Sequence, residues 1–283
     1  MPNLFRSFWK TKKTPLDKVL ADYELPSFRS SLCTVLSMLR KPESSLEEIA
    51  VHIEMDPGMH VKILKSVNSV AFGLTRKVAD ISHAVVLLGR SRLESAALSV
   101  AIKDVLPKAK SPAFNESHFW LAASRRASLA RLLARHLHPS TQALSFTAGL
   151  LQDMAVPILI SVLGDKYAEL YKAWTTSPAT ELHKLEQDAL GYDHAGLGAA
   201  MAEAWELPEI LATAIKAHPV PVEVCDANTA VQIVSLIRDN PNDPGTEQIV
   251  RLCEEKLGLP CAKTESYINE AFENAAEFAK AIQ

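Results

Sequence analysis

The strongest constraint in this sequence is a series of helix start and stop signals with no β-hairpin signal between them. Ser45 is placed to cap a helix whose first turn carries Glu47 and Glu48, and Asp56 followed by Pro57 starts the next helix. An aspartate accepts the free amide hydrogens of a first turn, and a proline there loses no hydrogen bond. Only 10 glycines occur in 283 residues, and Asn-Gly and Asp-Gly pairs are absent. The sequence therefore predicts an all-α fold.

The helical pattern runs along almost the whole chain and has one clear internal interruption. Apolar periodicity predicts helices over 27–40, 46–55, 57–67, 81–88, 93–106, 116–137, 140–152, 155–175, 178–190, 194–204, 208–217, 228–238, 246–257 and 264–282. Gly89 ends one of them, and Pro107 and Pro112 interrupt the helical periodicity at the segment 108–115. No sequence repeat accompanies the pattern, so a solenoid is not expected. We expect two packed helical subdomains.

The predicted organisation has three parts. Residues 1–15 form a basic tail, residues 16–220 form a domain made of a helical subdomain (16–110) and a second subdomain (111–220), and residues 221–283 form a C-terminal helical extension. The tail contains Phe5, Phe8 and Trp9 among basic residues, which suits either a membrane-surface or partner-binding segment or a tail packed on the body.

The composition narrows the cellular setting and the partners. A hydrophobic content of 48% is enough for a large core. No apolar run suits a signal peptide or a membrane span, and the four cysteines form no CxxC pair, so we expect a cytoplasmic protein with reduced thiols. Basic residues are in excess in the N-terminal half, but no helix-turn-helix or aromatic RNA-binding motif accompanies them, so DNA is not an expected partner.

Common catalytic motifs are missing from the sequence. There is no GxSxG elbow, no cysteine-protease signature, no Walker P-loop and no GxGxxG loop. The remaining candidate for chemistry is a group of scattered His and Asp residues.

Local motifs spread over about residues 22–220 resemble the HDOD domain family, which is related to the HD metal phosphohydrolases. The motifs that carry the resemblance are Leu25-Pro26, Asp56-Pro57 with the helix through Lys62, Leu64, Val67, Asn68 and Ser69, Phe72-Gly73, Ile81-Ser82-His83-Ala84, Leu88-Gly89, Phe119-Trp120, Ala148 to Asp153, Glu186, Leu190-Gly191, Asp193-His194 with Gly198, and Trp205 with Leu207-Pro208. The resemblance implies a bacterial signal-transduction protein with an HD-like multi-helical fold.

The resemblance also implies a degenerate metal site. The His-Asp pair of the HD enzymes falls at Gln152-Asp153, and an amide is a poor ligand for a transition metal. An earlier histidine falls at about Ala123 or Ser124, and no late acidic ligand is evident over 228–235. His194 and His218 survive. We therefore expect no metal, no cofactor and no catalytic residue.

The three surviving residues, Asp153, His194 and His218, have two interpretations. They could hold zinc with a water molecule as the fourth ligand, which would support a metal-dependent phosphohydrolase acting on a nucleotide. Alternatively, Asp153 accepts backbone amides near a helix junction, Asp193 or His194 caps the following helix, and His218 is a cation at a helix C-terminus. The missing ligands favour the second interpretation.

Function is expected to lie in binding. Asn68, Ser69, His83 and His194 lie at helix breaks within apolar motifs, and they are the predicted interaction groove between the subdomains. The competing interpretation is that Asn68 and Ser69 satisfy loop backbone groups and that His83 is an interface residue. The leading hypothesis is a non-catalytic regulatory module that binds other signalling proteins or a small ligand.

Two further groups of side chains have structural and functional interpretations. Trp120, Trp174 and Trp205 are expected in the core or lining a groove. Arg125-Arg126, Arg131 and Arg135 lie on one predicted helix and are interpreted as a solvated stripe, with an anionic partner as the alternative.

Overall fold

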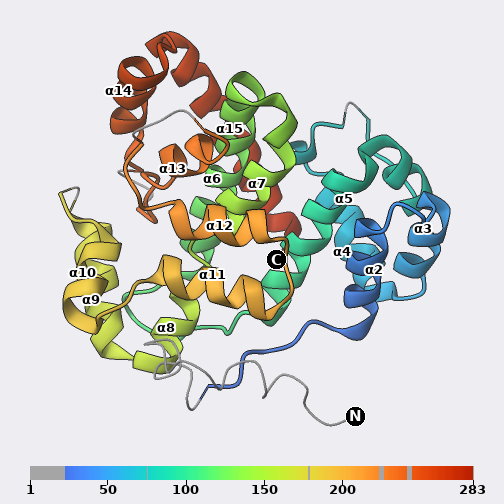
Figure 1. The fold of residues 1–283 in the computed structure, drawn as a ribbon, viewed down its shortest axis with the longest axis horizontal. Helices are drawn as coiled ribbons and strands as arrows, with labels where there is room; N and C mark the ends of the chain where they lie inside the picture. The colour runs from blue at the N-terminus through green and yellow to red at the C-terminus, as the bar shows by residue number, and fades with distance from the viewer. Residues whose placement is uncertain (1–22, 75, 178, 223–225, 241–243, 283) are drawn as a thin grey trace.

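The computed structural model describes residues 23–74, 76–177, 179–222, 226–240 and 244–282, and these residues form helices (Figure 1). The helices are α2 (Ser30–Arg40), α3 (Leu46–Glu54), α4 (Pro57–Val67), η3 (Val70–Phe72), α5 (Ile81–Val105), α6 (Glu116–Leu137), η4 (Pro139–Thr141), α7 (Gln142–Leu151), α8 (Val156–Leu163), α9 (Asp165–Thr176), α10 (Leu182–Leu190), α11 (His194–Ala204), α12 (Glu209–Ala217), α13 (Thr229–Val234), α14 (Thr246–Leu257) and α15 (Cys261–Ile282). Over these ranges the β pairing is limited to an isolated bridge between Ser111 and Phe114. The all-α prediction is confirmed. The aromatic residues of the predicted tail 1–15 lie outside the described residues.

The predicted helix starts are built from the expected side chains. Ser45 accepts a hydrogen bond from the backbone of Glu48 at 3.0 Å, and the Glu48 carboxylate accepts one from the backbone of Ser45 at 2.8 Å. Asp56 accepts from the backbone of Met59 at 3.0 Å, with Pro57 at the first helical position. At Gly89 the φ angle is 69°, so α5 is interrupted where a helix end was predicted.

The prediction of one continuous helix over 155–175 is wrong. The apolar pattern predicted a single helix over 155–175, whereas α8 ends and α9 begins on either side of Gly164, which has φ of 57° and ψ of −133°. Such a backbone cannot continue a right-handed helix. Because both helices bury apolar side chains, the hydrophobic pattern continues across the break and hides it.

The helices form two groups joined by a central set (Figure 1). In this view α2, α3 and α4 lie to the right and α8, α9 and α10 to the lower left, with α6 and α7 between them. One continuous core of buried apolar residues extends from α2 through α5 to α6, α7, α8, α11 and α12. A second core lies between α6, α13, α14 and α15. Helix α6 therefore contributes to both cores.

Three aromatic rings connect distant parts of the chain at the first core. Phe72 of η3, Phe146 of α7 and Phe278 of α15 are mutual neighbours, with ring centroids 5.2, 5.9 and 5.3 Å apart. All three side chains are buried. Aromatic pairs at such separations add to the hydrophobic stabilisation of a core. The C-terminal helix α15 thus packs on residues from both predicted subdomains.

One apolar stretch departs from the prediction that no segment could span a membrane. Residues Pro139–Leu163 have the length and a mean hydropathy of 1.7 that would permit a span. In the structure this stretch includes α7 and α8, and 83% of its most apolar 18-residue window is buried inside the protein. It forms part of the core.

Candidate functional site

The site is built around a close contact between α6 and α7. Gly149 of α7 faces the α6 backbone, and a methyl group added there would lie 3.0 Å from the carbonyl oxygen of Arg126. Only glycine allows this approach without displacement. α7 ends at Leu151, and Asp153, two residues later, lies beside the side chain of Arg126.

Arg126 is the cation at the centre of the site. Its side chain is fully buried, and Nη1 lies 2.7 Å from Oδ2 of Asp153 while Nη2 lies 3.2 Å from Oδ1 of Asp239. Nε and Nη2 also donate to the carbonyl of Ile237, at 2.9 and 2.6 Å. Burial alone would lower the pKa of Arg126, but Asp153 and Asp239 raise it. The guanidinium is therefore a permanent charge held between two carboxylates.

This position corrects the interpretation of Arg126 as part of a solvated stripe. Arg125 stacks its guanidinium 4.4 Å from the ring centroid of Phe272, and Arg131 is partly buried. Arg135 alone among the four is exposed. The sequence could not show this, because the partners of Arg126 lie in other helices and loops.

Asp239 is an acidic residue of the centre that the sequence did not reveal. It is buried and accepts a hydrogen bond from the hydroxyl of Tyr171 in addition to its contact with Arg126. Burial, with the nearby charge of Asp153, raises the pKa of Asp239 to about 6 despite the opposing effect of Arg126. Asp239 lies just beyond residues 228–235, the range in which the sequence shows no late acidic ligand.

The two surviving histidines meet at the same carboxylate. Nε2 of His194 and Nε2 of His218 are 3.0 Å apart, and they lie 3.4 and 3.3 Å from Oδ1 of Asp153. Their other ring nitrogens face acceptors: Nδ1 of His194 is 2.6 Å from Glu186, and Nδ1 of His218 is 2.6 Å from the carbonyl of Ile215. Asp153, His194 and His218 form a trio, and all three side chains are buried.

The hydrogen-bond partners indicate where the protons lie. Nδ1 of His218 donates to the carbonyl of Ile215, which leaves Nε2 of this ring as an acceptor. His194 can then donate from both nitrogens, to Glu186 and to the shared point near His218 and Asp153. Burial alone would lower the pKa of His194, but Glu186 and Asp153 raise it to about 10, whereas burial lowers the pKa of His218. His194 is thus a cation and His218 is neutral.

These contacts correct two structural expectations. Asp153 does not accept backbone amides; it binds Arg126 and the histidine pair. His218 does close helix α12, but burial favours its neutral form and not the cation that was expected at the helix end. The expected cap of α11 is Asp193, which accepts from the backbone of Gly196 at 2.7 Å.

The trio has the donor types of a metal site. Ligand atoms of Asp153, His194 and His218 lie within 4.8 Å of one another, and in the described part of the chain this group contains no fourth His, Cys, Asp or Glu. Glu186 and the Ile215 carbonyl would fix the orientation of the imidazoles, as acceptors bound to the other ring nitrogen do in metal sites. Against this, the amide of Gln152 replaces an imidazole, its Oε1 is buried without a partner, and Arg126 already neutralises Asp153. The trio fits three ligands of one divalent ion but not a complete two-metal centre.

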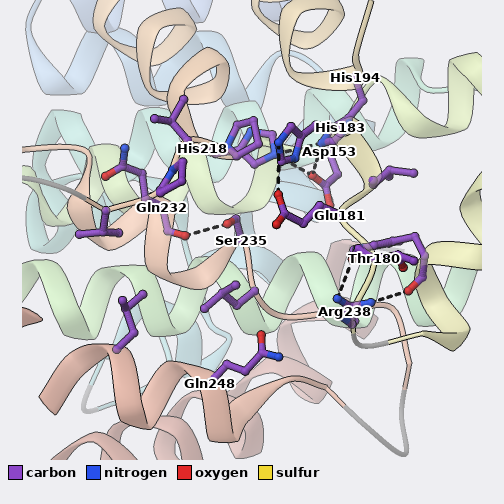
Figure 2. A pocket seen from close by; sticks show the side chains of 18 of the residues that line it. Asp153, Thr180, Glu181, His183, His194, His218, Gln232, Ser235, Arg238 and Gln248 are labelled. Atoms are coloured by element: carbon purple, nitrogen blue, oxygen red, sulfur yellow. Dashed lines mark hydrogen bonds and ion pairs between the residues drawn. The ribbon is translucent and has the colours of Figure 1, made fainter. Parts of the chain in front are cut away.

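A pocket of about 660 Å³ opens above the trio (Figure 2). Asp153, His194 and His218 belong to its lining, as do Trp174 and His183. Another wall comes from the predicted C-terminal extension, through Gln232, Ser235, Arg238 and Gln248. Arg238 is held in place by donating to the carbonyls of Trp174, Ser177 and Thr180. The extension therefore forms one wall of the candidate ligand pocket.

The residues of the predicted interaction groove do not lie together in this pocket. The side-chain amide of Asn68 bridges both backbone groups of Val78 at 2.8 Å, which braces the loop before α5. Ser69 is buried and donates to the carbonyl of Ser66. His83 is exposed in the first turn of α5. Of the four groove residues, His194 alone lines the pocket.

Comparison with known proteins identifies relatives of the chain and of its fold. Residues 25–221 match the family model described as HDOD domain. Solved structures with a similar fold include an HDOD domain protein of unknown function from Geobacter sulfurreducens (TM-score 0.70, 20% identity, 95% of this chain and 96% of that chain). A protein described as a candidate phosphohydrolase from Shewanella amazonensis gives TM-score 0.71 at 22% identity, covering 95% of this chain and 98% of that chain. A candidate signal transduction protein from Marinobacter aquaeolei gives 0.72 at 17%, covering 96% of this chain and 62% of that chain.

Two curated proteins are similar over part of their length. An uncharacterized protein of Treponema pallidum is 29% identical over 217 residues, which are 74% of this chain and 40% of that protein. YuxH of Bacillus subtilis, also uncharacterized, is 28% identical over 119 residues, which are 42% of this chain and 28% of that protein. The chain thus spans less than half the length of these relatives.

Proposed function

The chain belongs to the HDOD domain family, and from this premise we propose that it is a non-catalytic signal-transduction module. It acts by binding another signalling protein or a small ligand, with the pocket above Asp153, His194 and His218 as the binding site. The pocket lining combines apolar residues such as Trp174 and Leu252 with a larger number of polar and charged side chains, which suits a polar ligand or a polar segment of a partner.

The observation that carries this proposal is the position of Arg126. Its guanidinium lies between Asp153 and Asp239, where it supplies the positive charge that those carboxylates require. A buried carboxylate without a cation is costly, and a metal ion would otherwise be one way to compensate it. With Arg126 in place, the centre is neutralised by the chain itself. This supports a structural role for the centre.

A metal-dependent phosphohydrolase is the second candidate function, favoured by the convergence of Asp153, His194 and His218. A divalent ion held by these residues would activate water for attack on a phosphoester. In this chain His194 and His218 would have to give up the contact between their Nε2 atoms, and Asp153 would have to share its charge between the ion and Arg126. Glu186 would orient His194 in either case.

Metal content and hydrolysis separate the two candidates. The chain is purified without chelator, its Mn, Fe, Co and Zn contents are measured, and hydrolysis of bis(p-nitrophenyl) phosphate is followed with added Mn²⁺. The proposal expects metal far below one ion per chain and no Mn²⁺-dependent hydrolysis above that of Asp153→Asn. A stoichiometric metal that is lost in Asp153→Asn, together with hydrolysis, would establish the enzyme instead.

A further inference from the structure

Two arginines from different helices converge on the backbone at Gly73. Gly73 follows η3 and has φ of 61°. A methyl group placed on its Cα would lie 3.7 Å from Nη1 of Arg131 and 3.9 Å from Nη2 of Arg92. Arg92 belongs to α5 and Arg131 to α6, so the two guanidinium groups approach the same point from the two predicted subdomains.

The charges of this arginine pair are poorly compensated. Both side chains are partly buried, and within the described ranges neither makes a hydrogen bond or an ion pair of 4.0 Å or less. The negative charge of Glu270 in α15 raises the pKa of Arg131, whereas the positive charges of Arg92 and Arg135 lower it. Burial and the charge of Arg92 lower the pKa of Arg131 to about 10, and burial lowers the pKa of Arg92. Arg126 lies on the same helix as Arg131 and contacts two carboxylates. Arg92 and Arg131 contact no carboxylate in the described part of the chain.

We propose that Arg92 and Arg131 form a binding site for a phosphate group, either free inorganic phosphate or the phosphate of a small ester. A guanidinium presents a planar set of donors that matches phosphate oxygens, and two guanidinium groups match the charge of a phosphate dianion. A single carboxylate would leave one charge uncompensated. Gly73 contributes by having no side chain between the two groups.

A packing role alone accounts less well for this geometry. Arginines that serve mainly through their aliphatic stems direct their charged ends into water. Arg92 and Arg131 instead each place one guanidinium nitrogen within 4 Å of the same point beside the backbone of Gly73. The site is also separate from the pocket above Asp153, whose lining includes neither arginine. The phosphate site can therefore be tested independently of the proposed function.

Thermal unfolding and calorimetric titration of the full chain test the site. At constant ionic strength, replacing chloride by inorganic phosphate is expected to raise the Tm of the wild-type chain by about 3 °C. Arg92→Met and Arg131→Met should weaken phosphate binding by at least about tenfold and abolish the shift. Arg135→Met, on the exposed face of the same helix, should retain it. Without phosphate, Arg131→Met should be at least as stable as the wild type because the repulsion is removed.

A wild-type chain with no phosphate shift, or a shift that persists in both Arg92→Met and Arg131→Met, would overturn the proposal. If Arg131→Met does not fold, Arg131→Lys takes its place. This variant keeps the charge but loses the planar set of donors, so it should bind phosphate more weakly than the wild type. Titration with glycerol 3-phosphate and AMP identifies the source of the group. An ester that binds at least about tenfold more tightly than inorganic phosphate assigns a small ester, and equal binding assigns the free ion.

Discussion

The guanidinium of Arg126 and the carboxylate of Asp153 lie 2.7 Å apart in the interior. Asp153 follows Gln152, the residue at which the sequence departs from the His-Asp pair of the HD enzymes. Both side chains are buried, and each has further partners: Ile237 and Asp239 for the arginine, and the histidine pair for the aspartate. Removing one member of such a pair leaves an uncompensated charge in a medium of low polarity. This relationship leads to the first prediction.

Replacing Arg126 by Met should lower the free energy of unfolding by about 3–5 kcal/mol, because Asp153 and Asp239 then lose the guanidinium that lies between them and only His194 remains as a nearby cation. Urea unfolding followed by circular dichroism measures the change. Arg135→Met is the matched control on the same helix, and it should change stability by no more than about 1 kcal/mol because its side chain is exposed and loses only a 5.7 Å approach to the ring of Tyr267. Equal effects of the two substitutions would contradict the role given to Arg126.

The pKa of His194 predicts a loss of stability at alkaline pH. The folded protein raises this pKa from 6.5 to about 10, so the stabilisation is fully present below pH 6.5 and is lost as the pH rises toward 10. The loss should be on the order of a few kcal/mol. The decrease in unfolding free energy between pH 6.5 and 10 should be smaller in His194→Gln. Parallel profiles for the two proteins would show that His194 is not charged in the folded state.

Replacing Asn68 by Ala should destabilise the protein by about 1–3 kcal/mol, since both backbone groups of Val78 lose their partner. Asn269→Ala, at an exposed position of α15, is the control and should have little effect. Binding of a partner or ligand should fall in Asn68→Ala only in proportion to the folded fraction. A folded variant of unchanged stability with impaired binding would return Asn68 to the interaction surface.

Gly149→Ala should destabilise the protein by about 1–3 kcal/mol, because the added methyl group would meet the backbone of Arg126 at 3.0 Å and the side chain of Ala130 at 3.2 Å. The α6 and α7 helices would have to separate, which would also move Asp153 away from Arg126. The thermal melting temperature reports the first effect. A variant as stable as the wild type would show that the helices can shift without cost.

Much of the fold was predictable because its signals are local. Capping by Ser45 and Asp56 and the limits of α6, α11 and α14 follow from neighbouring residues. The break at Gly164 was not predictable, since apolar residues continue on both sides.

The candidate site was only partly predictable. The sequence identified Asp153, His194 and His218 through the family resemblance, and the structure brings them together. It did not identify Arg126 as their neighbour, because its partner Asp239 is 113 positions away and an arginine on a helix is exposed in most proteins. Glu186 was noted as part of a motif, but its contact with His194 depends on how α10 and α11 pack.

The ring of Phe278 has a consequence for how the protein is made. Phe278 completes the contact with Phe72 and Phe146, and α15 is synthesised after every helix on which it packs. During translation, η3 and α7 therefore emerge with the face that receives this ring uncovered. The earlier helices can begin to assemble on the ribosome, but the surface they offer to Phe278 stays open to chaperones until residue 278 has left the exit tunnel.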